Sequence, residues 1–203
     1  MADFTRFFIP LYFILFFTVS FLGISFRVAR QINKNPNVLP KDGSAYALVG
    51  RYFKLILLAL FTYSIALSLF PEVISGAFII HFMDVNLLKY IGIILMISAF
   101  VWVVVAQLQM KDSWRIGIDT EMKTRLVTHG LFGISRNPIF LGMTVSLLGF
   151  FLLFPTLTVF LFLLEGSILM QIQIRLEEED LNLKHGQTYL TYKKRVGRML
   201  SLY

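Results

Sequence analysis

The chain has 203 residues, of which 57% are hydrophobic and 15% charged, with a formal net charge of +7 and no cysteine. A soluble domain carries about 25% charged residues, so this composition predicts an integral membrane protein. The lack of cysteine excludes disulfides, thiolate metal sites and cysteine nucleophiles. The three histidines, His81, His129 and His185, show no metal-ligand spacing, so no metal is expected.

Five apolar stretches predict membrane-spanning helices. They run over Phe7–Phe26, Phe53–Phe70, Leu87–Gln109, Pro138–Phe154 and Thr156–Ile174. Each is close to the roughly 17–25 residues that a helix needs to cross a bilayer. The fourth and fifth are short and separated only by Pro155, which predicts a tight helical hairpin. We therefore expect an all-α integral membrane protein with about five transmembrane helices.

The segments beside these stretches predict the rest of the organisation. The first stretch lacks a basic region before it and a small-residue cleavage site, so we expect a retained anchor rather than a signal peptide. The connector Asn33–Gly43 contains two prolines. The apolar piece Val73–Met83 is too short to span and is predicted to be interfacial or re-entrant. The chain shows no internal repeat, and nothing in it indicates a second domain.

The positions of the basic residues predict the orientation in the membrane. Only Arg6 and Lys89 fall on one side, and the other 17 of the 19 basic residues share the opposite side. By the positive-inside rule, the N-terminus is expected outside and the C-terminus in the cytoplasm. We expect the cell membrane in a prokaryote or the endoplasmic reticulum in a eukaryote. The charge also suits anionic headgroups, and nucleic-acid binding is not expected.

The dense polar sequence lies in two blocks on the predicted cytoplasmic side, Trp114–Gly142 and Gln171–Arg198. In the second block, the fifth helix is expected to continue through the acidic run. Offsets of four and seven residues place Arg175 and Glu178 within about 40° of Gln171 around the helix axis, so the three share one face. Glu177 falls on the adjacent face, above Gln173. Taken alone, the acidic run is also typical of a solvated helix end, and Arg136 of an anchor at the headgroups.

Two motifs occur together in these blocks. "LVTHGLFGISRNPIFLG" is followed, after the hairpin, by "EEEDLNLKHGQTYLTYKKRV". This pair resembles the isoprenylcysteine carboxyl methyltransferase family, whose C-terminal half is shared by related phospholipid N-methyltransferases. The resemblance covers about Trp114–Arg198, a little under half of the chain.

The resemblance implies an S-adenosylmethionine-dependent methyltransferase within a single membrane domain, residues 1–203. Residues 1–110 are then three N-terminal helices, and residues 111–203 are the methyltransferase core with a cytoplasmic cofactor pocket formed by this C-terminal half. The residues that match the cofactor contacts of the family are Thr124, Arg125, Leu126, Val127, Phe132, Asn137, Pro138, Ile139, Phe140 and Glu177.

The chain departs from the family pattern at three positions. Asn137 stands where the family usually has histidine, Phe140 where it has tyrosine, and His185 where it has phenylalanine. Asparagine still donates and accepts hydrogen bonds but does not titrate. Phe140 keeps an aromatic ring for stacking on adenine and loses the hydroxyl group. A catalytic base at position 137 would therefore be lost, whereas a hydrogen-bonding role would be kept.

Charges near these motifs suggest roles in binding and catalysis. Arg136 can meet the carboxylate of the cofactor or orient the pocket without touching it, and Glu177 can meet a cationic group. Arg175, with its planar fork, suits a substrate carboxylate. Glu178 could instead accept a proton from an amine or attract an ammonium group. The expected substrate is therefore the carboxylate of a prenylated cysteine or a similar lipid, or alternatively a phospholipid amine of the phosphatidylethanolamine type.

Other readings of the sequence stay open. Glu165 lies near the middle of the fifth stretch, where a carboxyl group is costly and often functional. It is expected either to be protonated or hydrogen-bonded and packed against Thr144 or Ser146, or to shape a groove for the lipid substrate. A small transporter or scaffold would place more ionisable groups at this depth. Some sterol reductases also have a similar C-terminal half, but they are larger, and no G-x-G-x-x-G loop is present here.

Overall fold

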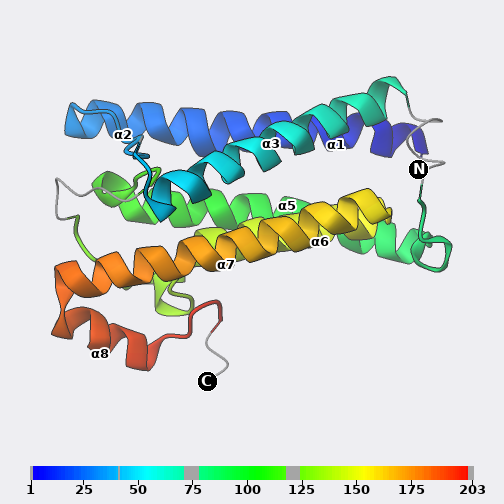
Figure 1. The fold of residues 1–203 in the computed structure, drawn as a ribbon. Coiled ribbons are helices and arrows are strands. Elements are labelled where there is room, and N and C mark those ends of the chain that lie inside the picture. The colour runs from blue at the N-terminus through cyan, green and yellow to red at the C-terminus, as the bar shows by residue number, and fades with distance from the viewer. Residues whose placement is uncertain (1, 41, 71–77, 118–123, 201–203) are drawn as a thin grey trace.

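The computed structural model describes residues 2–40, 42–70, 78–117 and 124–200, which form a bundle of helices running back and forth along one direction (Figure 1). The elements in chain order are α1 (Ala2–Phe17), η1 (Thr18–Gly23), α2 (Ile24–Ile32), α3 (Ala45–Leu69), η2 (His81–Met83), α5 (Asn86–Met110), η3 (Lys111–Ser113), η4 (Gly130–Gly133), α6 (Pro138–Leu153), α7 (Leu157–His185) and α8 (Gln187–Arg195). Within these ranges the extended pairing is limited to two isolated bridges. The all-α prediction is confirmed.

Four helices of the described chain are long and apolar enough to cross a membrane: Phe4–Ile32, Ala45–Leu69, Asn86–Ser113 and Leu157–His185. The first of them joins α1, η1 and α2 into one continuous helix. The remaining predicted span is α6, which is apolar but has only 16 residues. At 1.5 Å per residue it is about 24 Å long, compared with about 30 Å for the hydrocarbon core of a bilayer. The chain is a multi-pass membrane protein with one short helix.

The second span begins earlier than the sequence predicted. Helix α3 starts at Ala45 rather than at Phe53, because Ser44 caps its first turn by accepting a hydrogen bond from the Ala47 N–H at 3.2 Å. Side-chain oxygens at this position satisfy N–H groups that have no partner inside the helix. As a result, Lys54 lies within α3 and not in the preceding loop.

Helices α6 and α7 form the predicted hairpin, with residues 154–156 as the turn. Pro138 is the first residue of α6, where its missing N–H costs nothing. The hairpin turn pairs with the loop before α5, since the Ile80 N–H donates to the carbonyl oxygen of Pro155 at 2.8 Å. Of the piece predicted to be interfacial, residues 73–77 lie outside the described residues, and the described remainder contains only the short helix η2.

Glycines allow α5 and α6 to pack at very short range. A Cβ atom placed on Gly92 would lie 2.5 Å from the carbonyl oxygen of Gly149, and one on Gly149 would lie 2.8 Å from the carbonyl oxygen of Gly92. Further along, a Cβ on Gly142 would lie 2.5 Å from Val103. Small residues at such crossings bring membrane helices together, because dispersion contacts rather than water exclusion hold them in lipid.

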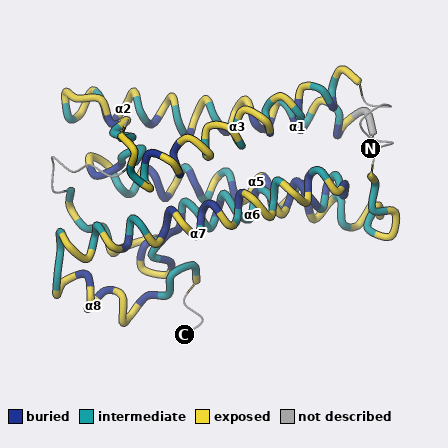
Figure 2. Tube along the Cα trace, viewed as in Figure 1, coloured by how far each residue is buried: buried dark blue, intermediate teal, exposed yellow. Residues whose placement is uncertain are grey.

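The interior of the bundle is aromatic. Its main cluster contains Phe13, Phe16 and Phe150, all less than 9% exposed, together with Tyr12. The Tyr12 hydroxyl donates to the carbonyl oxygen of Met96 and shares a hydrogen bond with Ser146, so α1, α5 and α6 are joined by one polar link. Figure 2 shows exposed residues along the outer sides of the helices, and many of them are large and apolar, as expected for contact with lipid.

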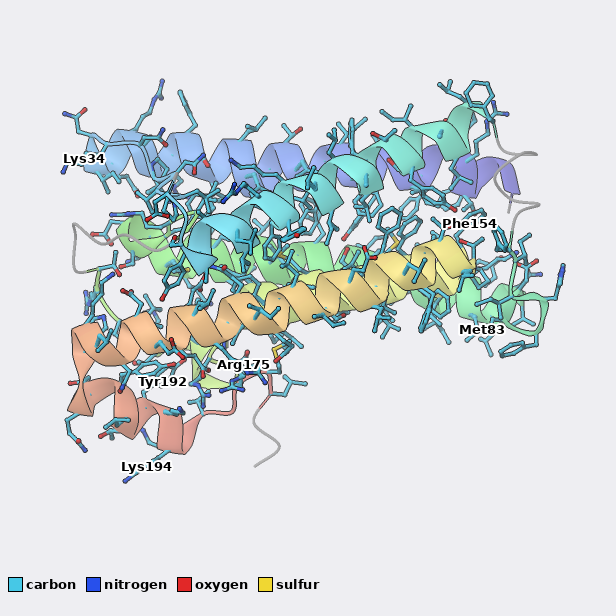
Figure 3. The ribbon with its side chains drawn as sticks, viewed as in Figure 1. Lys34, Met83, Phe154, Arg175, Tyr192 and Lys194 are labelled. Carbon is cyan, nitrogen blue, oxygen red and sulfur yellow. The ribbon has the colours of Figure 1, made fainter. Side chains whose placement is uncertain are left out.

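The two ends of the bundle differ in composition. One end is formed by residues 33–40, 42–44, 111–117, 124–137 and 186–200, and we call it the basic end. Figure 3 labels Lys34, Tyr192 and Lys194 there, and Met83 and Phe154 at the opposite end. Helix α1 begins at that opposite end as well, whereas α8 lies at the basic end (Figure 1).

Candidate active site

A cavity of about 290 Å³ lies among the spans near the basic end. We call it the main cavity. Every long helix of the bundle contributes to its wall, as do two loops of the basic end. Its lining residues are Phe16, Phe21, Asn37, Leu39, Gly50, Phe53, Lys54, Leu57, Val103, Gln107, Met110, Trp114, Arg115, Ile116, Gly117, Ile139, Phe140, Met143, Gln173 and Glu177. The sequence predicted a pocket formed by the C-terminal half, whereas this cavity takes residues from both halves.

The polar part of the main cavity contains one carboxylate and two cations. Glu177 on α7 accepts a hydrogen bond from Gln173 Nε2 at 2.8 Å, as their spacing of four residues predicted. Lys54 comes from α3, and Arg115 from the loop after α5. Gln107, on α5, is 3% exposed and supplies a neutral amide. The cavity therefore offers partners to both a cationic and an anionic group of a ligand.

The apolar part leads toward the middle of the bundle. A second cavity of about 50 Å³ lies between α1, α3, α6 and α7 and is almost entirely apolar in its lining. The two cavities share the lining residues Phe16, Phe53, Leu57 and Met143. A polar compartment at the basic end thus adjoins an apolar one within the depth of the membrane.

Two loops far apart in the sequence pair with each other beside the main cavity. The Val38 N–H donates to the carbonyl oxygen of Ile116 at 3.0 Å, and the Ile116 N–H donates to that of Pro36 at 3.0 Å. Leu39 packs against Gly117, whose φ of +94° favours glycine. The connector before α3 is therefore fixed against the segment after α5, and both supply lining residues.

Four side chains form a cluster around an ion pair on an adjacent face of α7. In this Glu178 cluster, one carboxylate oxygen of Glu178 accepts from Arg136 Nη2 at 2.7 Å and the other from Arg198 Nη2 at 2.9 Å. Asn137 Nδ2 lies 3.4 Å from the same oxygen as Arg136 and donates to the carbonyl oxygen of Arg198 at 3.0 Å. Glu178 is 5% exposed, and its carboxylate raises the pKa of the Arg198 guanidinium. Its charge is therefore neutralised within the protein.

The C-terminal segment is attached to the motif around Arg136 by further contacts. Arg136 Nη1 donates to the carbonyl oxygen of Val196 at 2.6 Å, and the Tyr192 hydroxyl donates to that of Phe132 at 2.6 Å. Tyr189, which is 1% exposed, packs beside Tyr192, and burial raises its pKa to about 12. Helix α8 and the residues after it therefore form one unit with the loop that begins α6.

The structure separates the predicted site residues into groups. Ile139, Phe140 and Glu177 line the main cavity. Arg136, Asn137 and Glu178 belong to the Glu178 cluster. The other predicted cofactor contacts do not line the cavity, and they are Thr124, Arg125, Leu126, Val127, Phe132 and Pro138. Within this last group, Leu126 packs against Tyr189, Tyr192 and Val196, and the Pro138 carbonyl oxygen accepts from Trp102.

The two residues predicted to be catalytic do not line the main cavity. Arg175 is exposed and donates to the carbonyl oxygen of Gln171 at 2.8 Å (Figure 3). Glu178, three residues further along α7, turns inward to the Glu178 cluster. A carboxylate that already pairs with two guanidinium groups is a poor proton acceptor, because protonation would give up both ion pairs. Glu178 therefore joins α7 to the start of α6 and to the C-terminal segment.

Glu165 also differs from one of its two expected arrangements. Its side chain is exposed on the outer surface of α7. Thr144 instead donates to the carbonyl oxygen of Phe140, and Ser146 pairs with Tyr12. The expectation that Glu165 packs against Thr144 or Ser146 is wrong, because the residue is exposed on α7.

Sequence reasoning missed several residues of the site. Gln107 was included in an apolar stretch, although a buried amide inside a span is a signal for function. Lys54 and Arg115 were treated only as basic loop residues. Arg198, which completes the Glu178 cluster, lies two residues after the second quoted motif. Only the tertiary arrangement brings these positions together.

Comparisons with known proteins support the class of enzyme. Residues 88–187 match a family model described as phospholipid methyltransferase. The match begins inside α5 and ends at the start of α8, so it includes Glu177 and Glu178 but not Arg198. No curated protein sequence matches the chain significantly.

Among solved structures, the chain is similar to one described as a eukaryotic intramembrane Ras methyltransferase, isoprenylcysteine carboxyl methyltransferase. The TM-score is 0.65 with 19% sequence identity, and the alignment covers 100% of this chain and 68% of that one. At this identity the likeness shows a common fold. The match to the phospholipid methyltransferase model over just under half of the chain, together with this fold, supports a membrane-embedded methyltransferase.

Proposed function

We propose that the protein transfers a methyl group from S-adenosylmethionine to the polar head of a lipid or lipidated substrate, and that the reaction takes place in the main cavity. The observation that carries this proposal is the junction of two compartments. The main cavity holds charged and amide groups near the basic end, and the adjoining cavity is apolar and lies between spans. A substrate with a reactive head and a hydrocarbon tail fits such a junction.

The side chains that line the main cavity include chemical partners for the charged and aromatic groups of S-adenosylmethionine. This molecule carries an aromatic base, an ammonium group, a carboxylate and a sulfonium centre, and it supplies an electrophilic methyl group. Glu177 is the carboxylate that can meet a cationic group, and Lys54 is the cation that can meet an anionic one. Arg115, whose Nη1 donates to the carbonyl oxygens of Asp112 and Trp114, adds positive charge to the same wall. Phe140 offers a ring for stacking. Charged groups are costly to bury without partners, so a complementary set of this kind favours binding.

The chain's own residues would act mainly by positioning. A displacement at a methyl group requires the attacking atom to lie in line with the breaking bond, and good alignment can contribute on the order of 7–11 kcal/mol. The paired loops at Val38 and Ile116 fix one wall of the cavity, and the Glu178 cluster fixes the start of α6. Packed aromatic residues such as Phe16 and Phe53 limit the access of water.

The substrate that we favour is the carboxylate of a prenylated cysteine or a similar lipid. A carboxylate is already ionised at neutral pH, so its methylation requires no general base. Lys54 is a partner for such a group, and the positive charge of Arg115 lies on the same cavity wall. The solved structure with this fold is described as an isoprenylcysteine carboxyl methyltransferase, which supports the same choice.

A phospholipid amine is the second candidate, and the description of the matching family favours it. An ammonium headgroup must lose a proton before it can attack a methyl group. Glu177 is the carboxylate among the lining residues that could attract such a headgroup. The two candidates therefore use opposite charges of the same cavity.

The chemistry of the product distinguishes them. Purified protein is incubated with S-adenosylmethionine that carries a labelled methyl group, and with either an N-acylated S-prenylcysteine or phosphatidylethanolamine vesicles. Carboxyl methylation gives an ester that releases labelled methanol in base, whereas an N-methyl group stays on the lipid. We expect base-labile label on the prenylcysteine. Base-stable label on phosphatidylethanolamine alone would replace this assignment with the second candidate, and no transfer to either would contradict both.

A further inference from the structure

A further cavity, of about 150 Å³, lies at the end of the bundle opposite the basic end, where Figure 3 labels Phe154. We call it the distal cavity. Its described lining residues are Thr5, Arg6, Leu67, Ile79, Asp84, Lys89, Leu153 and Phe154. None of them lines the main cavity or the apolar cavity beside it. The distal cavity is therefore a separate site on the molecule.

The distal cavity lies over the end of the short helix α6. This helix ends at Leu153 after 16 residues, whereas α3 and α5 have 25 residues each. A Cβ atom on Gly92 of α5 would lie 2.7 Å from the backbone nitrogen of Leu153, so α5 contacts the last residue of α6. Lys89 precedes Gly92 by about one turn of this antiparallel helix and so lies beyond the end of α6. A hollow is left there between α1, α3 and α5.

The loop before α5 forms one wall of the distal cavity and is fixed by backbone hydrogen bonds. The Ile80 N–H donates to the carbonyl oxygen of Pro155, and the Leu157 N–H donates to that of Phe78 at 3.0 Å. These two bonds lie on either side of Ile79, which lines the cavity. The wall is therefore attached to the turn between α6 and α7.

Arg6 brings to the distal cavity a positive charge that has no acidic partner among the described residues. Its Nε donates to the carbonyl oxygen of Ser68, and its guanidinium carbon lies 5.5 Å from the centre of the Phe7 ring. Ser68 is in the last turn of α3, where carbonyl groups lack partners inside the helix, so this contact joins α1 to α3. It uses one N–H group of the guanidinium and leaves both Nη groups for a ligand.

Lys89, the second cation of the distal cavity, already has a counter-charge. Its Nζ lies 2.6 Å from Asp84 Oδ1, and the two side chains are 20% and 40% exposed. The described lining residues therefore leave the positive charge of Arg6 uncompensated. Arg6 and Lys89 are also the two basic residues predicted on this side of the membrane. Separate anchors at the membrane surface have no need to meet at one cavity, whereas two cations that hold one anion must do so.

The chemistry of the lining indicates a ligand with a negative charge and an apolar part. An arginine without a counter-charge at a half-buried site is costly, and an anion beside it offsets that cost. The planar guanidinium group matches phosphate, which it binds through two N–H groups at once. The apolar lining suits the glycerol and the first carbons of acyl chains, and it is formed by Leu67, Ile79, Leu153 and Phe154.

We propose that the distal cavity binds the headgroup of an anionic phospholipid, with Arg6 on the phosphodiester oxygens and Lys89 beside them. The bound lipid then links α1, α3 and α5 at the end of the bundle that α6 does not reach. Asp84 limits the affinity, because it holds Lys89 and places a like charge near the phosphate. This site takes no part in methyl transfer.

The test measures the binding of phosphatidylglycerol to purified, delipidated protein in a neutral detergent. A fluorescent phosphatidylglycerol is displaced by unlabelled competitors, which gives the apparent Kd of each. We expect phosphatidylglycerol to bind roughly tenfold more tightly than phosphatidylcholine, which has no net charge. Glycerophosphoglycerol carries the same phosphodiester without acyl chains and should compete far more weakly. Equal competition by phosphatidylcholine would overturn the charge match, and equal competition by glycerophosphoglycerol would overturn the lipid in favour of a soluble phosphate ester.

Two variants should change this affinity in opposite directions. Arg6→Gln removes the uncompensated charge and should weaken phosphatidylglycerol binding roughly ten- to a hundredfold. Asp84→Asn frees Lys89 and removes a like charge, so it should strengthen binding by roughly threefold or more. An ion pair that served stability alone would instead give Asp84→Asn a lower Tm and an unchanged affinity, which would overturn the site.

The control is Lys194→Gln, which removes an exposed lysine at the basic end and should bind like the wild-type protein. Asp84→Asn leaves the contact between Arg6 and Ser68 intact, so the test does not depend on the folding of Arg6→Gln. A loss of affinity in Lys194→Gln as large as that in Arg6→Gln would show attraction to the protein's overall charge and would overturn the distal cavity as the binding site.

Discussion

Two carboxylates that are neighbours in the sequence of α7, Glu177 and Glu178, have different surroundings and different expected roles. Successive residues of an α-helix point about 100° apart. Glu177 consequently faces the main cavity, whereas Glu178, turned by about 100°, faces Arg136 and Arg198. The first is placed to meet a ligand, and the second holds parts of the protein together. Two substitutions to glutamine separate these roles.

Glu177→Gln is expected to weaken the binding of S-adenosylhomocysteine by roughly ten- to a hundredfold. A hydrogen bond to a charged group contributes about 1.5–3 kcal/mol, and the amide loses that charge. Calorimetric titration of the folded variant measures the effect. Glu179→Gln, an exposed neighbour on the same helix, serves as the control. Equal affinity in both variants would remove Glu177 from the binding site.

Glu178→Gln should mainly reduce stability. The change leaves Arg136, whose side chain is 7% exposed, without its buried counter-charge. Removal of one partner of a buried ion pair typically costs about 3–5 kcal/mol. We expect a clear fall in the apparent Tm in detergent, together with easier proteolysis near Lys193. A variant as stable as Glu179→Gln would show that the Glu178 cluster contributes little.

At the level of elements, the closest contact is the crossing of α5 and α6. A Cβ on Gly149 would lie 2.8 Å from a backbone oxygen and 3.0 Å from a backbone nitrogen, neither of which can turn away. Gly149→Ala should therefore destabilise the protein by about 1–3 kcal/mol, the usual cost of overpacking. Gly43→Ala is the matched control, since nothing lies within 4 Å of its added Cβ. Apparent Tm values that agree for the two variants would argue against close packing at this crossing.

The sequence predicted the elements well where local rules decide them. Runs of apolar residues marked the spans, Pro155 marked the hairpin turn, and Pro138 began α6 as expected. The start of α3 was missed because residues 45–52 are only moderately apolar, so hydropathy gave little weight to the cap at Ser44. Element η1, a π-helical turn that contains Ser20, also has no clear sequence signal, since the residues around it are as apolar as the rest of the span.

The site was less predictable than the elements, and the reason is the geometry of the whole molecule. Motif resemblance found Phe140 and Glu177, which the structure brings to the main cavity. The same reasoning could not place Gln107 or Lys54 there, because these residues come from helices without a motif. It also could not separate a residue that faces a ligand from one, such as Arg136, that holds the C-terminal segment.

The orientation in the membrane is a prediction for the molecule as a whole. Of the 19 basic residues, 17 are expected on one side, which predicts that the N-terminus is outside and the C-terminus inside. Reporter fusions after Lys41, Asp84, Arg115 and Tyr203 should read inside, outside, inside and inside. The structure places α8 at the basic end and the N-terminus opposite (Figure 1). An outside reading for the fusion after Tyr203 would invert this topology and move the main cavity to the other side of the membrane.

The short helix α6 has a consequence for the lipid around the protein. Its 16 residues reach only about 24 Å, so the hairpin turn lies below the surface of an average bilayer. Its pairing with Phe78 and Ile80 satisfies backbone groups at that depth. Hydrophobic mismatch on this side should thin the surrounding bilayer, at a cost of fractions of a kcal/mol per ångström. In vesicles of increasing acyl-chain length, the apparent Tm of the protein should therefore be highest in thin bilayers, and a thin membrane is where we expect it to accumulate in a cell.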